Sequence, residues 1–258
     1  MVLFILFSGH NISSSKVWEY DNKLNKTNFL KDLKKLGKVY CYVNNIYKLI
    51  SLPKYPPKEE KYAKFFRGKP DKIDIEQFNI DKECQKVYEK IKSQKEDVIV
   101  IGHSIGGIYA INFCNMYPKK CKKIILIESV KLLSSYQQWP KEMKVPRLTN
   151  KKIKELENNI LTDNKNAEES AKQLSNMIGY KTFKYRSNKL KVPTLFFEDI
   201  KPKKTEKLLK LNKYEEEMSK IHGNIIQFIN LIDTGHFPWQ KQRYCDQMIK
   251  QIKCFITR

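Results

Sequence analysis

Short apolar runs alternate with amphipathic stretches along most of the chain, and the two patterns predict different elements. Apolar runs of strand length predict strands at residues 2–7, 39–43, 98–101, 123–127, 192–197 and 224–231. Apolar residues at helical spacing predict helices at residues 28–36, 81–93, 108–116, 150–161, 166–178 and 240–256. Strands that alternate with helices in this way favour an α/β fold, with a mostly parallel central sheet and helices on both faces.

One segment, residues 129–190, interrupts this alternation with two helical patterns and no strand. At 258 residues the chain is long enough for one domain with a sizeable core. We therefore expect a single domain, built from a first core part at 1–128, an insertion at 129–190 and a second core part at 191–258. No run approaches the roughly 18 consecutive apolar residues that a membrane span needs.

The most informative motif joins a predicted strand to a predicted helix. The pattern Gly-x-Ser-x-Gly occupies residues 102–106, directly after the apolar run 98–101 and before the helical stretch 108–116. A sharp turn between a strand and a helix exposes the hydroxyl of its central residue, and small flanking residues allow that turn. The motif is common by itself, but in this context it predicts that Ser104 is a nucleophile. The backbone N–H of Ile105 would then face a developing oxyanion.

With this motif in place, the chain resembles the α/β-hydrolase family over nearly its whole length. Residues 2–7 lead into a Ser-Gly-His sequence that is similar to the family's His-Gly loop, although Ser8 stands where the family usually has histidine. The resemblance implies that the backbone N–H of His10 is the second oxyanion donor, beside that of Ile105. It also implies an α/β-hydrolase fold with a central sheet flanked by helices.

The general base is predicted near the other end of the chain. Residues 233–239 resemble the family's Gly-His-Phe turn, which carries the catalytic histidine, and this makes His236 the partner of Ser104. Of the other histidines, His103 lies inside the serine motif and His222 has no turn signal beside it. A histidine that accepts the serine proton needs a carboxylate that fixes its tautomer and stabilises the imidazolium.

The sequence leaves the position of that carboxylate open. Most relatives place it shortly after the strand predicted here at 192–197, where Asp199 and Glu198 are the available carboxylates. Some relatives place it at the end of the preceding strand instead. That position is Glu128, 24 residues after Ser104, and the spacing matches the second arrangement. We favour Glu128 and keep Asp199 and Glu198 as alternatives, because carboxylates at strand ends also serve as helix caps.

The insertion at 129–190 lies where relatives of this family carry a cap or lid over the active site. By the same resemblance, Tyr136 and Trp139 would line a substrate pocket. An apolar stripe of this kind more often reflects simple packing of the insertion on the core.

A serine nucleophile favours carboxylic ester hydrolysis through an acyl-enzyme, with lipid esters and thioesters as variants, and no cofactor. Acyl transfer and perhydrolysis would use the same residues. Two hypotheses from other classes remain: a non-catalytic relative that only binds ligands, and a basic protein that binds an anionic membrane or nucleic acid. Labelling of Ser104 by a covalent probe would separate the first hypothesis from the other two.

The six cysteines, at 41, 84, 114, 121, 245 and 254, form no Cys-x-x-Cys pair and lie near no histidine at zinc spacing. No metal site is therefore expected. Cys41 and Cys114 are predicted to be buried free thiols, which favours a reducing, cytoplasmic location.

The net charge of +22 is large, with 50 Lys and Arg against 28 Asp and Glu. The basic residues are dispersed and do not interleave with aromatic residues, so a specific nucleic-acid platform is not predicted. The favoured interpretation is that these lysines simply coat the surface, and weak association with anionic membranes or acidic substrates is the alternative.

Overall fold

A computed structural model of the chain describes residues 2–9, 15–18, 28–42, 79–129, 148–162, 165–184, 190–200, 213–220, 223 and 225–258. Within these residues, no helix combines the length and the apolar character that a membrane crossing requires.

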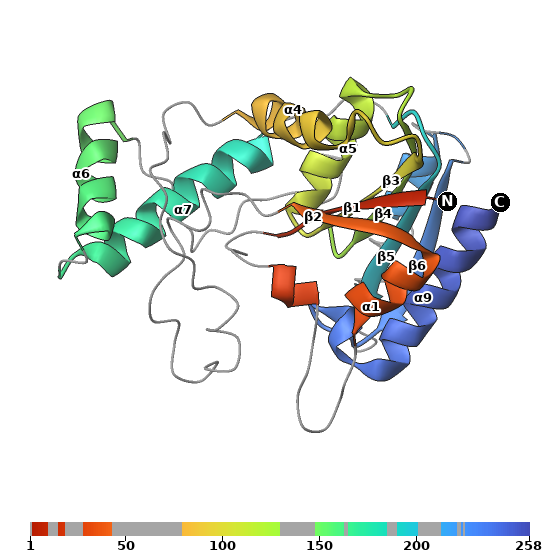
Figure 1. Ribbon diagram of the computed structural model, residues 1–258. Helices are drawn as coiled ribbons and strands as arrows, with labels where there is room; N and C mark the ends of the chain where they lie inside the picture. The colour runs from red at the N-terminus through yellow and green to blue at the C-terminus, as the bar shows by residue number, and fades with distance from the viewer. Residues whose placement is uncertain are drawn as a thin grey trace.

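A parallel sheet forms the centre of the molecule (Figure 1). Its strands are β1 (Val2–Phe7), β2 (Gly37–Tyr42), β3 (Asp97–His103), β4 (Cys121–Ile127), β5 (Thr194–Ile200) and β6 (Ile226–Ile232). They lie in the order β2-β1-β3-β4-β5-β6, and every neighbouring pair is parallel. The carboxyl ends of all these strands therefore lie at one edge of the sheet, which is where ligands bind in open α/β sheets.

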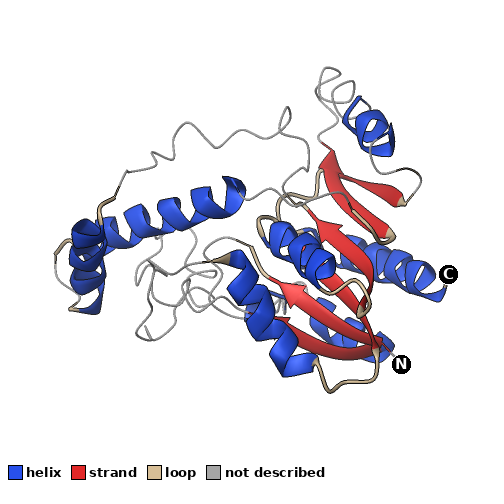
Figure 2. Ribbon diagram, turned by 90° about the horizontal axis from the view of Figure 1, so that it is seen from above, coloured by secondary structure: helices blue, strands red, loops and turns tan. Residues whose placement is uncertain are grey.

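Helices cover both faces of this sheet, as the alternating pattern predicts (Figure 2). The main helices are α1 (Phe29–Leu36), α4 (Ile80–Ile91), α5 (Gly106–Met116), α6 (Asn150–Leu161), α7 (Ala167–Lys184) and α9 (Gln242–Thr257); residues 213–220 are also helical. Short 3-10 helices, η1 and η4, lie at Ser15–Trp18 and Pro238–Gln240.

Each face of the sheet has its own apolar core because successive strand side chains point to opposite sides. Leu3 and Ile5 of β1 pack with α4 and α5, whereas Phe4 and Leu6 pack with α1 and α9. Side chains of β3 follow the same alternation. The strands are apolar on both faces, which is typical of a fully covered parallel sheet.

Helices α6 and α7 lie within the predicted insertion and form a small unit of their own. They pack on each other through Ile153, Leu156, Leu174 and Ile178, apart from the two cores of the sheet. In Figures 1 and 2 the pair extends beyond the sheet and covers neither face of it. Residues 130–147, which include the predicted pocket residues, lie outside the described part of the chain.

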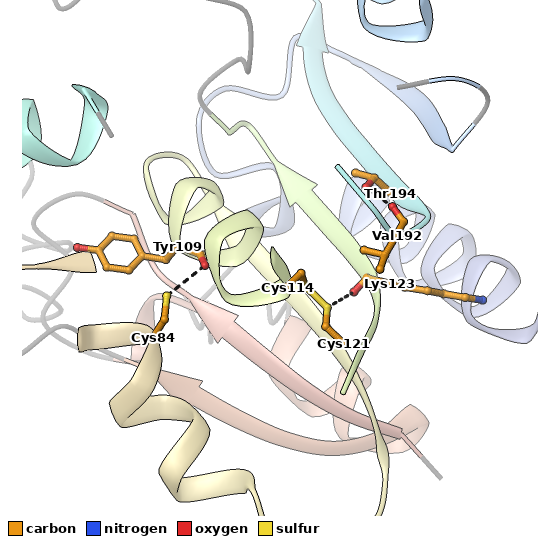
Figure 3. Close-up of a disulfide and its surroundings, with 7 residues drawn as sticks. All are labelled: Cys84, Tyr109, Cys114, Cys121, Lys123, Val192 and Thr194. Carbon is orange, nitrogen blue, oxygen red and sulfur yellow. Dashed lines mark hydrogen bonds between the residues drawn. A yellow bond between two sulfur atoms is a disulfide. The ribbon is translucent and has the colours of Figure 1, made fainter. Parts of the chain in front are cut away.

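The prediction that Cys114 is a free thiol is wrong. Cys114 forms a disulfide with Cys121, with the two Cα atoms 5.2 Å apart (Figure 3). Helix α5 ends at Met116 and β4 begins at Cys121, so a tight connection brings the last turn of the helix beside the start of the strand. Cys41 forms no disulfide, as predicted, but is only half-buried. The disulfide also removes part of the support for a reducing, cytoplasmic location.

Candidate active site

The serine motif forms a sharp turn between β3 and α5. Ser104 has a φ of 53°, a left-handed conformation that L-residues rarely adopt, and α5 begins two residues later. The turn is crowded: a Cβ atom at Gly102 would lie 2.5 Å from the Cα atom of Gly107, and one at Gly106 would lie 2.3 Å from the carbonyl oxygen of Phe7. Only glycine allows these approaches. The local geometry is the one that exposes a serine hydroxyl above the sheet.

The end of the neighbouring strand β4 holds this turn in place. The backbone N–H of Ser104 donates to the carbonyl oxygen of Ile127 at 3.0 Å. The Ser129 hydroxyl donates to the carbonyl oxygen of Ser104, also at 3.0 Å. Between these two residues, Glu128 adopts a left-handed backbone conformation with a φ of 44°. Residues at both ends of the Glu128 turn thus bind the backbone of the candidate nucleophile.

The loop after β6 carries His236 and is built from two left-handed residues. Asp233 has a φ of 52° and Gly235 a φ of 77°. Immediately after His236, η4 anchors the loop in the core, where the fully buried Trp239 donates its indole N–H to the carbonyl oxygen of Val17 at 2.9 Å. Because η4 is packed in the core, the movement of the His236 loop that precedes it is limited.

The two histidines join the serine turn to this loop across the sheet edge. His103 Nε2 lies 2.8 Å from the carbonyl oxygen of His236, and the two rings are 4.6 Å apart. Burial lowers the pKa of His236, and it lowers the pKa of the fully buried His103 well below the usual range, with the charge of His236 as the second cause. Both rings are therefore neutral at neutral pH, which is the form that a general base needs.

Ser104 and His236 both follow strands that end at the same edge of the sheet. Within the described residues, no hydrogen bond joins the Ser104 hydroxyl to the His236 ring. Such contacts are often loose before substrate binds and tighten in the complex.

Two of the candidate carboxylates, Glu128 and Asp199, lie between the serine turn and the histidine loop. Asp199 accepts hydrogen bonds from the backbone N–H groups of Thr234 at 2.7 Å and Gly235 at 3.3 Å, one to each carboxylate oxygen. Glu128 accepts a hydrogen bond from the backbone N–H of Asp199. The structure therefore brings Glu128, Asp199 and the histidine loop into one chain of hydrogen bonds.

The other predicted site residues make none of the contacts described above. Ile105 is buried at the start of α5. Glu198 lies within β5, one residue before Asp199. His10, Tyr136 and Trp139 lie outside the described residues. The described part of the chain contains no cluster of His, Cys, Asp or Glu side chains that could hold a metal ion.

Known proteins share this fold. A family model described as serine aminopeptidase, S33, matches residues 73–197, a stretch that includes the serine turn, Glu128 and all but the last three residues of β5. An α/β-hydrolase enzyme from the metagenome of sediments from the Mar Chica lagoon, Morocco, matches 99% of this chain and 90% of its own, with 12% identity and a TM-score of 0.58. The chain has the α/β-hydrolase fold.

Other solved structures match the chain equally broadly. An esterase from a marine microorganism has 17% identity and a TM-score of 0.54, and covers 96% of this chain and 94% of its own. MenH from S. aureus has 13% identity and a TM-score of 0.56, and covers 99% of this chain and 93% of its own. Identities this low establish the fold alone. No curated protein sequence matches the chain.

Two residues that the motifs do not predict, His103 and Ser129, support the candidate site. The serine motif assigns no chemical role to the side chain of His103, and no motif includes Ser129. The signal for Ser129 was its place directly after Glu128, at the end of a strand that neighbours the serine turn. The signal for His103 was strand alternation, which directs it to the face where the chain returns after β6.

Proposed function

We propose that this protein is a serine hydrolase that cleaves carboxylic esters through an acyl-enzyme on Ser104. The observation that carries the proposal is the contact between the serine turn and the His236 loop, because it brings a strained serine and a neutral histidine to the same sheet edge. The marine esterase, which has the same fold, supports an ester as the substrate class. The substrate would be a small-molecule or lipid ester, and no cofactor is needed.

In the proposed reaction, His236 takes the proton of the Ser104 hydroxyl as the serine oxygen attacks the ester carbonyl. The backbone N–H groups of Ile105 and His10 would stabilise the oxyanion that forms. The imidazolium then returns the proton to the departing alkoxide, which leaves as the alcohol. Water repeats the sequence on the acyl-enzyme, and the acid and free Ser104 are released. An alcohol in place of water would give acyl transfer.

We propose Glu128 as the carboxylate that orients His236, with Asp199 as the alternative. Both oxygens of Asp199 already accept hydrogen bonds from Thr234 and Gly235, so its carboxylate is occupied in holding the loop. Glu128 projects from the strand end that also binds the Ser104 backbone, and its side chain reaches the end of β5. In the proposed reaction, one of these carboxylates accepts a hydrogen bond from the His236 ring.

The insertion at 129–190 is proposed to act as a cap, with Tyr136 and Trp139 in the substrate pocket. Helices α6 and α7 pack with each other and not on a face of the sheet, which suits a separate covering unit. The net charge of +22 supports weak association with anionic lipid surfaces that would carry such substrates.

Reaction with a fluorophosphonate probe tests the proposal. The folded wild-type protein is expected to become labelled, Ser104→Ala to remain unlabelled, and the exposed-surface control Ser93→Ala to react like wild type. No labelling of folded wild type would overturn the hydrolase proposal and favour a non-catalytic binding protein.

The same probe identifies the orienting carboxylate. Loss of the orienting carboxylate costs a serine enzyme on the order of 10⁴-fold in rate. We expect Glu128→Gln to show a loss of this size, and Asp199→Asn, which keeps one acceptor oxygen for the loop, to show a much smaller one. The reverse order would transfer the role to Asp199.

A further inference from the structure

The residue before the candidate nucleophile is a fully buried histidine at the meeting point of two loops. His103 has no exposed surface, and its ring lies 4.8 Å from that of Trp239 and 6.0 Å from that of Trp18. It also lies 5.0 Å from the ring of Phe237. The proposed reaction gives His103 no chemical step, so its burial needs another explanation.

Strand alternation explains how His103 reaches this position. Ile99, Ile101 and His103 share one face of β3, and the two isoleucines pack with α1 and α9. The loop after β6 returns on this same face, because Trp239 is part of the same apolar core. The side chain of His103, which is part of the serine motif, therefore points toward the loop that carries His236.

The hydrogen bond of His103 fixes its tautomer. A carbonyl oxygen can only accept, so the 2.8 Å contact with the carbonyl oxygen of His236 requires a proton on Nε2 of His103. The ring is neutral, so Nδ1 carries no proton; this atom is buried and has no hydrogen-bond partner. The Nδ1 edge faces Gly9, where an added Cβ atom would come within 3.0 Å of it.

We propose that His103 is a positioning residue that fixes the place of His236 relative to Ser104. It does so through the Nε2–H bond to the His236 backbone and through the packing of its ring between the histidine loop and Gly9. This inference rests on the proposed function, in which Ser104 and His236 react. A neutral donor suits the position, because a buried cation 4.6 Å from the His236 ring would oppose the imidazolium that forms during the reaction.

The two amide side chains provide a matched test. In glutamine the amide nitrogen can occupy the position of the imidazole Nε2, whereas in asparagine it corresponds to Nδ1 and cannot reach the His236 carbonyl oxygen. We expect His103→Gln to keep kcat for a nitrophenyl ester within about 5-fold of wild type. His103→Asn and His103→Phe should lose about 10²-fold in kcat with KM nearly unchanged, as expected for misplacement by about 1 Å.

Phenylalanine matches the volume of the histidine ring better than glutamine does, so a role in packing alone would favour His103→Phe. Activity that is kept only in His103→Gln therefore indicates that the hydrogen bond positions the loop. Equal activity of the Gln and Asn variants, or a fully active His103→Phe protein, would overturn the inference. Thermal unfolding of each variant shows whether it is folded before its kinetics are compared.

Nitrogen-15 NMR of the histidine rings provides a readout that does not depend on turnover. In wild type and in Ser104→Ala, His103 is expected as the neutral Nε2–H tautomer, with a scalar coupling to the His236 carbonyl carbon. A protonated Nδ1 would overturn the inference. If the coupling is present but wild type does not react with the fluorophosphonate probe, the proposed function fails while the hydrogen bond stands.

Discussion

At the scale of single residues, the serine turn depends on the absence of a side chain at Gly106. A side chain at Gly106 would have its Cβ atom 2.3 Å from one backbone oxygen, that of Phe7, and 2.6 Å from another, that of Ser8. Backbone atoms in the centre of a sheet cannot move aside as a flexible side chain can. The end of β1 and the start of α5 are therefore in contact only because residue 106 has no side chain.

We expect Gly106→Ala to lower the free energy of unfolding by about 2–3 kcal/mol, as overpacking of a core does, and to abolish probe labelling. Gly223→Ala is the matched control: the position also needs a left-handed backbone, with a φ of 70°, but nothing lies within 4 Å of the added atom. The control should cost about 1 kcal/mol and react normally. Urea unfolding measures both, and equal losses would contradict the packing argument.

Residue patterns predicted the sharp turn at Ser104 because strand, turn and helix signals are all local. They could not decide between Glu128 and Asp199, because that choice depends on how side chains from β4 and β5 reach across the sheet edge. The hydrogen bond between Asp199 and Thr234, for example, joins residues that are 35 positions apart in the sequence. The periodicity of apolar residues cannot predict contacts between residues so far apart in the sequence.

At the scale of elements, the predicted strands and helices agree with the structure except at their ends. β3 was predicted to end at residue 101 but continues to His103, because Gly102 and His103 both pair with β4. β5 continues to Ile200 for a similar reason, since its last residues pair with β6. Apolar runs locate the buried middle of a strand, whereas its ends are set by neighbouring strands.

The disulfide between α5 and β4 yields a prediction at this scale. It closes a loop with a sequence separation of 7, so chain entropy predicts a stabilisation of about 2–3 kcal/mol. Cys114→Ser should lose this amount in urea unfolding, whereas Cys254→Ser, at an exposed free thiol, should not. Thiol titration of the denatured, unreduced wild type should find the four free cysteines at 41, 84, 245 and 254. Six reactive thiols would contradict the disulfide.

At the scale of the whole molecule, the order of the strands brings the proposed chemistry together. The turns that follow β3, β4, β5 and β6 carry or adjoin Ser104, Glu128, Asp199 and His236, and these strands are consecutive neighbours in the sheet. The alternation of strands and helices predicted a parallel sheet, from which a shared edge follows. The strand order itself was not predictable from periodicity, because it depends on which strands pair.

Acid should destabilise the whole molecule through its buried histidines. Burial lowers the pKa of His103 and His236 in the folded state, so below about pH 6.5 the unfolded chain binds more protons than the folded one. Stability is therefore complete above this pH and is lost as the pH falls toward the folded-state pKa. Each histidine therefore contributes a loss of stability as the pH falls from 7.5 to 5.5.

Urea unfolding at these two pH values measures the loss. His103→Gln should show a smaller difference than wild type, since glutamine does not titrate. An equal difference in both proteins would mean that His103 is not buried as a neutral ring. Its immediate ring neighbours are Trp18, His236, Phe237 and Trp239, and of these only His236 titrates in this range.

The bond between His103 and the His236 backbone has a mechanical consequence. The candidate nucleophile and the residue that holds the candidate base are consecutive in the chain, on one turn of the backbone. When that turn moves, Ser104 and His236 therefore move together, and the distance between them changes little. The sheet edge can fluctuate as a whole while the gap across which the proton moves stays nearly constant.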